Sequence, residues 1–170
     1  YGDISSTQSG IIIPKPGSSN LYYIFTVDEP HHENAAVYPN AFSGSYIEPG
    51  SGDVPSMDDG KNNGLNYSVV DLSITGNNGS IGNVTTRNVH LTTYNTTPNG
   101  AEIKYKCSEK ITAVKNELDN TYWVITHFTD KFYAFRIDEN GVSSFPIVSN
   151  IGSNQQVSGY RRNAIGYLKA

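Results

Sequence analysis

Short apolar runs separated by polar breaks recur along this chain, and they predict antiparallel β-strands. The clearest group covers residues 110–138, where three runs rich in β-branched and aromatic residues alternate with breaks that carry Asn, Asp or Lys. The pattern predicts strands over 110–115, 121–127 and 131–138. Because no segment shows an apolar period of about 3.6 residues over a useful length, we predict an all-β chain.

An earlier part of the chain repeats this order of runs and breaks. It predicts strands over 9–13, 21–28, 64–73 and 84–93, with a turn region rich in Gly and Asn over 74–83. The strand over 21–28 is apolar at both odd and even positions, which is typical of a strand that is covered on both faces.

The later group continues into a fourth strand. Asn140 and Gly141 predict a type I′ hairpin turn, because both residue types accept the positive φ angles that this turn requires. The strand predicted over 142–149 contains Pro146, which places it at the edge of a sheet. A further apolar run starts at Ala164 and predicts the first strand of a third group.

The runs therefore repeat as a four-stranded unit. Residues 9–15 match 109–115 in position, and residues 20–27 match 120–127. Repeated units of four antiparallel strands are typical of a β-propeller, so we predict a propeller-like fold with two blades and the first strand of a third. The alternative is a β-sandwich whose strands resemble one another. Since such arrays need about three units to be stable, we expect the chain to be part of a longer polypeptide.

We expect the units to form one continuous domain. The first blade-like unit covers residues 1–108 and contains an insertion over 29–63 that is rich in Pro, Gly and acidic residues. The second unit covers 109–159, and the third begins within 160–170.

The runs that carry the repeat also resemble a known family. They read STQSGIIIP over 6–14, LYYIFTVD over 21–28, GLNYSVVD over 64–71, EKITAV over 109–114, WVITH over 123–127, PIVSNIG over 146–152 and AIGYLK over 164–169. Together they resemble the N-terminal propeller-like region of large secreted proteins of Bacteroidetes. Those proteins leave the cell through the type IX secretion system, and many carry gliding-motility-associated (type B) sorting domains. The resemblance implies a fold and an extracellular or cell-surface location, and it implies no reaction.

Composition narrows the function classes. The net charge of -4 lacks the basic excess of a nucleic-acid binder. Charged residues make up 16 % of the chain, below the usual ~25 %, and uncharged polar residues replace them, as in many extracellular β-proteins. No apolar run reaches the length of about 18 residues that would predict a membrane span. Cys107 is the single cysteine, so we expect a structural thiol without an internal disulfide.

Aromatic residues in the insertion are the main binding candidates. Tyr38, Phe42 and Tyr46 lie outside the predicted strands, so they are free to contact surface proteins or to stack on the sugar rings of glycans. The insertion also holds Asp53 and the pair Asp58 and Asp59. We keep two interpretations of these carboxylates, a calcium site in a loop or a solvated acidic segment. We expect no other cofactor.

The function that fits these observations is a non-enzymatic extracellular or cell-surface module, which acts as a scaffold or as an adhesin-type binding domain. One alternative is part of a secreted carbohydrate-active enzyme, which needs two facing carboxylates. Asp28 and Asp71 are the candidates for that pair, because each ends a predicted strand. A second alternative is a purely structural subunit of a surface assembly.

Overall fold

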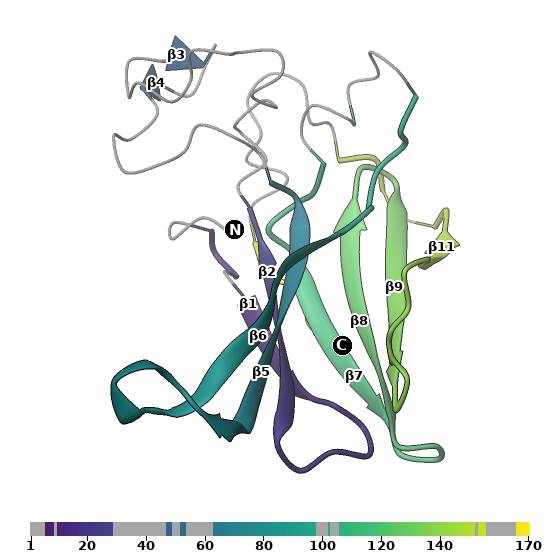
Figure 1. Cartoon of the computed structure of the whole chain (residues 1–170). Helices are drawn as coiled ribbons and strands as arrows, with labels where there is room; N and C mark the ends of the chain where they lie inside the picture. Colours follow the sequence, from purple (N-terminus) through teal and green to yellow (C-terminus); the bar gives the residue numbers. More distant parts are fainter. Residues whose placement is uncertain are drawn as a thin grey trace.

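The all-β prediction is confirmed by the structure, a computed structural model in which the strands form two main antiparallel sheets (Figure 1). The structure describes residues 6–8, 10–28, 47–48, 52–53, 63–97, 102, 106–151, 153–155 and 166–170, with the backbone alone for 47–48 and 52–53. Two sheets in contact through one face each are common to a pair of propeller blades and to a sandwich.

The first sheet follows the strand order that the sequence predicts. Its neighbouring strands are β1 (Gly10–Pro14), β2 (Leu21–Val27), β5 (Leu65–Thr75) and β6 (Ile81–Leu91). All neighbours pair antiparallel, so the sheet is a meander with β1 and β6 at its edges. A separate short hairpin joins β3 (Ile47–Glu48) to β4 (Gly52–Asp53) within the predicted insertion.

The second sheet repeats the meander. It contains β7 (Ile111–Asn116), β8 (Thr121–Phe128), β9 (Lys131–Asp138), β10 (Gly141–Val142) and β11 (Ile147–Ser149). The prediction of one continuous strand over 142–149 is wrong, because β10 and β11 pair with β9 separately. Pro146 has no N–H to donate, and the Ser143 hydroxyl donates a hydrogen bond of 2.7 Å to the Phe145 carbonyl, which closes a local turn instead.

Two turn predictions also need correction. Strand β5 continues to Thr75 and β6 already begins at Ile81, so the predicted turn region over 74–83 shrinks to a short 3₁₀ turn at Asn77–Gly79. The type I′ turn is not formed, because Asp138 pairs with Gly141 and neither residue between them has a positive φ. Of the predicted third unit, residues 166–170 are described, and they are not in a strand.

The repeat of the first strands is displaced by one residue from the prediction. Ile13 pairs with Tyr23, whereas Val114 pairs with Trp123. If Tyr23 and Trp123 are equivalent, Ile13 corresponds to Val114 and not to Ala113. The cause is the length of the turns. The Lys15 N–H still bonds to the Leu21 carbonyl, which leaves five residues (16–20) in the first turn, whereas four residues (117–120) lie between the paired Asn116 and Thr121.

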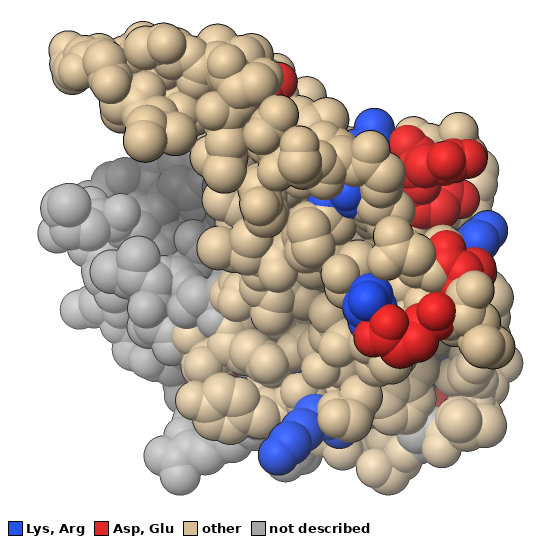
Figure 2. All heavy atoms as spheres, turned by 90° about the horizontal axis from the view of Figure 1, so that it is seen from below, with Lys and Arg blue, Asp and Glu red and all other residues tan. Residues whose placement is uncertain are grey.

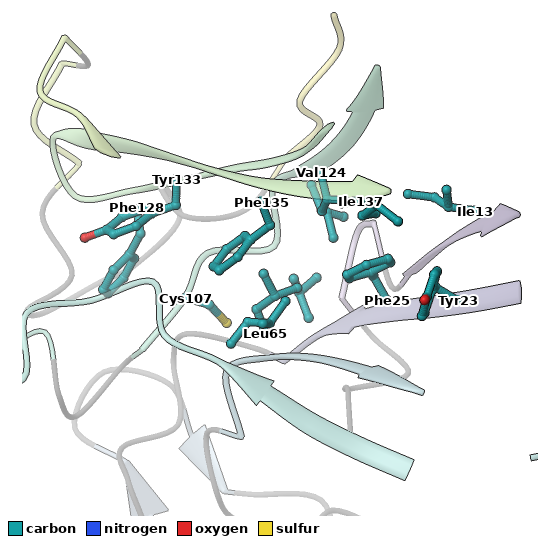
Figure 3. Packing of buried hydrophobic residues seen from close by; sticks show 13 residues of the cluster. Ile13, Tyr23, Phe25, Leu65, Cys107, Val124, Phe128, Tyr133, Phe135 and Ile137 are labelled. Atoms are coloured by element: carbon teal, nitrogen blue, oxygen red, sulfur yellow. The ribbon is translucent and has the colours of Figure 1, made fainter. Parts of the chain in front are cut away.

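One hydrophobic core lies between the two sheets. Phe25 and Leu65 come from the first sheet and point toward Val124, Phe135 and Ile137 of the second (Figure 3). All five side chains are fully buried. Burial of aromatic and branched side chains from both sheets is the main stabilising contribution to their contact.

The described terminal segments are tied to this core by one side chain. The Gln8 Oε1 atom accepts a hydrogen bond of 3.2 Å from the Ile111 N–H and another of 3.2 Å from the Leu168 N–H. Close by, the Thr7 N–H donates to the buried Glu109 carboxylate at 2.6 Å. The start of β7 therefore lies beside both the N-terminal and the C-terminal segments.

Candidate functional site

A polar cavity of about 490 Å³ lies where the turns of both sheets meet. Its lining residues come from the β1–β2 turn, the β7–β8 turn, the start of β8, the end of β9 and the β9–β10 turn: Pro16, Gly17, Asp119, Asn120, Thr121, Arg136, Asp138, Glu139 and Asn140. A second cavity of about 290 Å³ adjoins it and shares Arg136, Asp138 and Asn140. Residues that lie far apart in the sequence thus surround one space.

Arg136 is the central side chain of this cavity. It lies on β9, two residues before Asp138, so both side chains project from the same face of the strand. Its Nη2 atom lies 3.3 Å from Asp119 Oδ2, and its Nη1 atom lies 3.6 Å from Asp138 Oδ2. The guanidinium therefore holds a carboxylate of the neighbouring turn beside one of its own strand.

Hydrogen bonds within the turns fix the two carboxylates. Asp119 Oδ1 accepts from the Thr121 hydroxyl at 2.6 Å and from the Thr121 N–H at 3.2 Å. Asp138 Oδ1 accepts from the Asn140 N–H at 2.8 Å. These are Asx-type turns, in which the side chain replaces a backbone acceptor. Each carboxylate uses one oxygen for its own turn and presents the other to Arg136.

Gly17 brings the first sheet up to the same cavity. Its φ of +76° is in the left-handed region that favours glycine. A Cβ atom at this position would lie 3.6 Å from the Glu139 Cβ, so the β1–β2 turn and the β9–β10 turn are in close proximity. Glu139 itself is exposed.

The cavity is acidic overall. It contains the carboxylates of Asp119, Asp138 and Glu139 against the one guanidinium of Arg136, which makes a formal charge of -2 (three negative, one positive). Acidic and basic side chains gather over the second sheet on this end of the molecule, while the half that belongs to the first sheet is mostly uncharged (Figure 2). The Thr121 hydroxyl and, more weakly, Arg136 hold the pKa of Asp119 below its usual value, so this group stays ionised at neutral pH.

The binding residues predicted in the insertion lie outside the described residues. This holds for Tyr38, Phe42 and Tyr46. It also holds for Asp58 and Asp59 of the predicted calcium site. Asp53 is described only by its backbone, in β4. The predictions for these residues therefore stay predictions. Among the residues that the structure describes, no group of three or more His, Cys, Asp or Glu side chains has the arrangement of a metal site.

The carboxylates considered for a glycosidase pair do not meet. Asp71 pairs with Leu21 at one end of β2, whereas Asp28 follows Val27 at the other end. Seven residues of extended strand separate these ends by roughly 23 Å, whereas the paired carboxylates of a glycosidase lie about 5–10 Å apart. Each has a structural role, since Asp28 Oδ2 accepts from the Asn63 N–H at 2.5 Å and Asp71 Oδ1 accepts from the Ser73 N–H at 2.8 Å.

Cys107 is fully buried in the core between the sheets (Figure 3). Burial raises the pKa of its thiol well above the usual value, because the thiolate would be desolvated. Its Sγ lies 3.5 Å from the Asp28 carbonyl oxygen. These observations agree with the expected structural thiol.

The sequence patterns did not identify the Arg136 cavity. Its residues were visible only as polar breaks between strands and as an Asp at the end of a strand, and such residues usually serve turns. A signal in the sequence was the alternation in β9, where one face begins with Phe132 and Ala134 and continues with the charged Arg136 and Asp138.

Comparisons with protein-family models, with curated proteins and with solved structures gave no match. Within the described part of the chain, no helix has the length and apolar character needed to cross a membrane.

Proposed function

We propose that this chain is a non-enzymatic binding module of an extracellular or cell-surface protein, and that the Arg136 cavity binds basic side chains of a partner protein. The location follows the resemblance to the propeller-like region of type IX-secreted proteins and the low content of charged residues. The observation that carries the binding role is the cavity of about 490 Å³, lined by both sheets, with three carboxylates and one guanidinium.

The charges of the cavity favour a cationic ligand. A formal charge of -2 attracts Lys or Arg side chains, and the half-exposed ion pairs of Arg136 leave carboxylate oxygens accessible to them. The depressed pKa of Asp119 supports binding over acid–base catalysis, since a glycosidase requires one carboxylic acid with a raised pKa.

A titration with a fluorescently labelled oligolysine peptide tests the proposal. Fluorescence anisotropy should show binding that weakens as salt is added. The double substitution Asp138→Asn and Glu139→Gln should weaken it by about 2- to 30-fold, at roughly 0.2–1 kcal/mol for each exposed charge. The matched control is Asp71→Asn, which removes a carboxylate of the first sheet that lies outside the cavity lining. Equal effects of the double variant and the control would contradict a role of the cavity.

The proposed location has its own test. The native protein is expected in the extracellular or outer-surface fraction of its source cells, where added protease reaches it. Recovery from the cytoplasmic fraction alone would exclude this part of the proposal.

A further inference from the structure

The smaller cavity that adjoins the Arg136 cavity differs from it in charge. It has a volume of about 290 Å³, and its lining residues are Arg136, Asp138, Asn140, Gly141, Val142 and Ser143. Its charged side chains are one guanidinium and one carboxylate, so its formal charge is zero (one positive, one negative). We call it the neutral cavity. Because the two cavities share three lining residues, a ligand in the acidic one extends next into a space that favours an uncharged polar group.

Most polar groups of the neutral cavity already have hydrogen-bond partners within the fold. The Ser143 N–H donates to the Arg136 carbonyl at 2.8 Å, and the Ser143 hydroxyl donates to the Phe145 carbonyl at 2.7 Å. The Asp138 carboxylate accepts from the Asn140 N–H at 2.8 Å and pairs with Arg136. These groups shape the turn after β9, which leaves them little capacity for a ligand.

The Asn140 side chain is the exception. Among the residues that the structure describes, its amide group has no hydrogen-bond partner, although its backbone N–H is held by Asp138. The residue is exposed and lines both cavities. An Asn amide offers two N–H donors and a carbonyl acceptor. It can therefore donate to the carbonyl of a peptide group and accept from a peptide N–H, which neither a carboxylate nor a guanidinium can do alone.

The backbone that follows Asn140 leaves room for the main chain of a ligand. Gly141 carries no side chain, and its φ of +129° lies in the range that favours glycine. Glycine in the lining of a cavity allows another backbone to approach closely. The neutral cavity thus combines an accessible amide with an open stretch of main chain.

We propose that the ligand is a basic residue within a polypeptide, and that the two cavities bind two parts of it. The basic side chain enters the acidic Arg136 cavity, as in the function proposed above, on which this inference rests. The neutral cavity binds the adjoining peptide group through the Asn140 side chain. Asn140 is thus a specificity-determining residue, which distinguishes a segment of protein from a small polycation such as a polyamine.

A peptide group matches the neutral cavity in charge and in hydrogen bonding. It is uncharged, it lies beside every side chain of a polypeptide, and it presents one donor and one acceptor. A polyamine offers ammonium groups and no acceptor. A further ammonium group in the neutral cavity would meet the Arg136 guanidinium as well as the Asp138 carboxylate, so it gains no net attraction there.

Isothermal titration calorimetry with two probes of equal charge tests this inference. One probe is tetralysine with both termini capped, and the other is spermine, which carries the same number of positive charges and no peptide group. The wild type should bind tetralysine more tightly than spermine. Asn140→Ala should weaken tetralysine binding by about 3- to 10-fold, the effect of about one lost hydrogen bond, and should change spermine binding by less than about 2-fold.

Asn120→Gly provides the matched control. Asn120 lines the Arg136 cavity and is not part of the lining of the neutral cavity. Its φ of +54° is one that glycine accepts. The variant removes the same amide from the acidic cavity alone, so it should keep the wild-type ratio of the two affinities. All variants are checked for the far-UV circular dichroism of the wild type, and the comparison of the two probes on the wild type requires no variant.

An equal effect of Asn140→Ala on both probes, or no effect on either, would overturn this inference. A wild type that binds spermine at least as tightly as tetralysine would overturn it too. In these cases the function proposed above still stands if the double substitution Asp138→Asn and Glu139→Gln weakens the binding of both probes. A wild type that binds neither probe would contradict both proposals.

Discussion

Replacement of Phe25 by Ala should remove a substantial part of the stability of this domain. The Phe25 side chain is 0 % exposed and lies between the sheets. Its ring centroid is 5.7 Å from that of Tyr67 and 6.3 Å from that of Tyr23. Truncation of a buried Phe typically costs about 3–5 kcal/mol through lost transfer free energy and the cavity that remains. Each lost aromatic pair contributes about 0.5–1.5 kcal/mol, so we expect about 4–5 kcal/mol, near the upper end.

Urea denaturation followed by circular dichroism measures this loss as a change in the free energy of unfolding. Phe145→Ala provides a matched control, because it removes the same side chain from a position that is 84 % exposed. The control should change the free energy of unfolding by less than about 0.5 kcal/mol. Since domains of this size are stable by about 5–15 kcal/mol, the difference is readily measured. If both variants lose stability to within about 1 kcal/mol of each other, the core assigned here is wrong.

Further predictions concern the hydrogen bonds of Gln8 to the terminal segments, the buried Cys107 and the buried His127. Gln8→Ala should lower the free energy of unfolding by about 1–3 kcal/mol, because the Ile111 and Leu168 N–H groups lose their acceptor, whereas Gln8→Glu keeps an acceptor and should lose less in the same urea experiment. The Cys107 thiol should react with a thiol reagent in urea but not in the native state, and rapid native labelling would contradict its burial. Burial, assisted by Lys110, lowers the pKa of His127. As the pH falls, the unfolded chain therefore binds a proton at His127 before the folded chain does, so the free energy of unfolding should fall as the pH drops below about 6.5. It should fall less in His127→Gln. An equal fall in both proteins would contradict the lowered pKa of His127.

The strand order of both sheets was predictable because the local patterns and the tertiary contacts agree. In β2 and β8, β-branched and aromatic residues occupy both sides of the strand. One side packs in the core and the other side is only partly buried, so both parities read as apolar. Pro146 marked the irregular edge of the second sheet, although it broke the strand instead of merely placing it at the edge.

The details that failed depend on contacts that a local pattern does not contain. The Gly- and Asn-rich stretch at 74–83 looked like a long turn, but pairing of Thr75 with Ile81 extends both strands into it. The Asn140-Gly141 pair suggested a type I′ turn. The Asn140 N–H instead donates a hydrogen bond to the Asp138 carboxylate, and a different turn forms. In each case a hydrogen bond outweighed the intrinsic preference of the residues.

The Arg136 cavity could not be predicted from the sequence for a different reason. Pro16 and Gly17 meet Glu139 only because the two sheets pack together, and Asp119 reaches Arg136 only across the β8 strand. The side that each strand turns to the core was equally hidden, because a strand that is apolar on both parities fits either orientation. The match between residues 20–27 and 120–127 does not by itself show which side of either strand is buried.

The orientation of β8 is the central claim, and the chain's single tryptophan reports on it directly. Acrylamide quenching of Trp123 fluorescence should be measured at a concentration at which the protein is monomeric, with the urea-unfolded chain as reference. Trp123 lies on the side of β8 that faces away from the core cluster and is partly exposed, so its emission should be quenched to an intermediate extent. Emission that resists quenching in the folded monomer, as from a fully buried indole, would place Trp123 in the core and contradict the account.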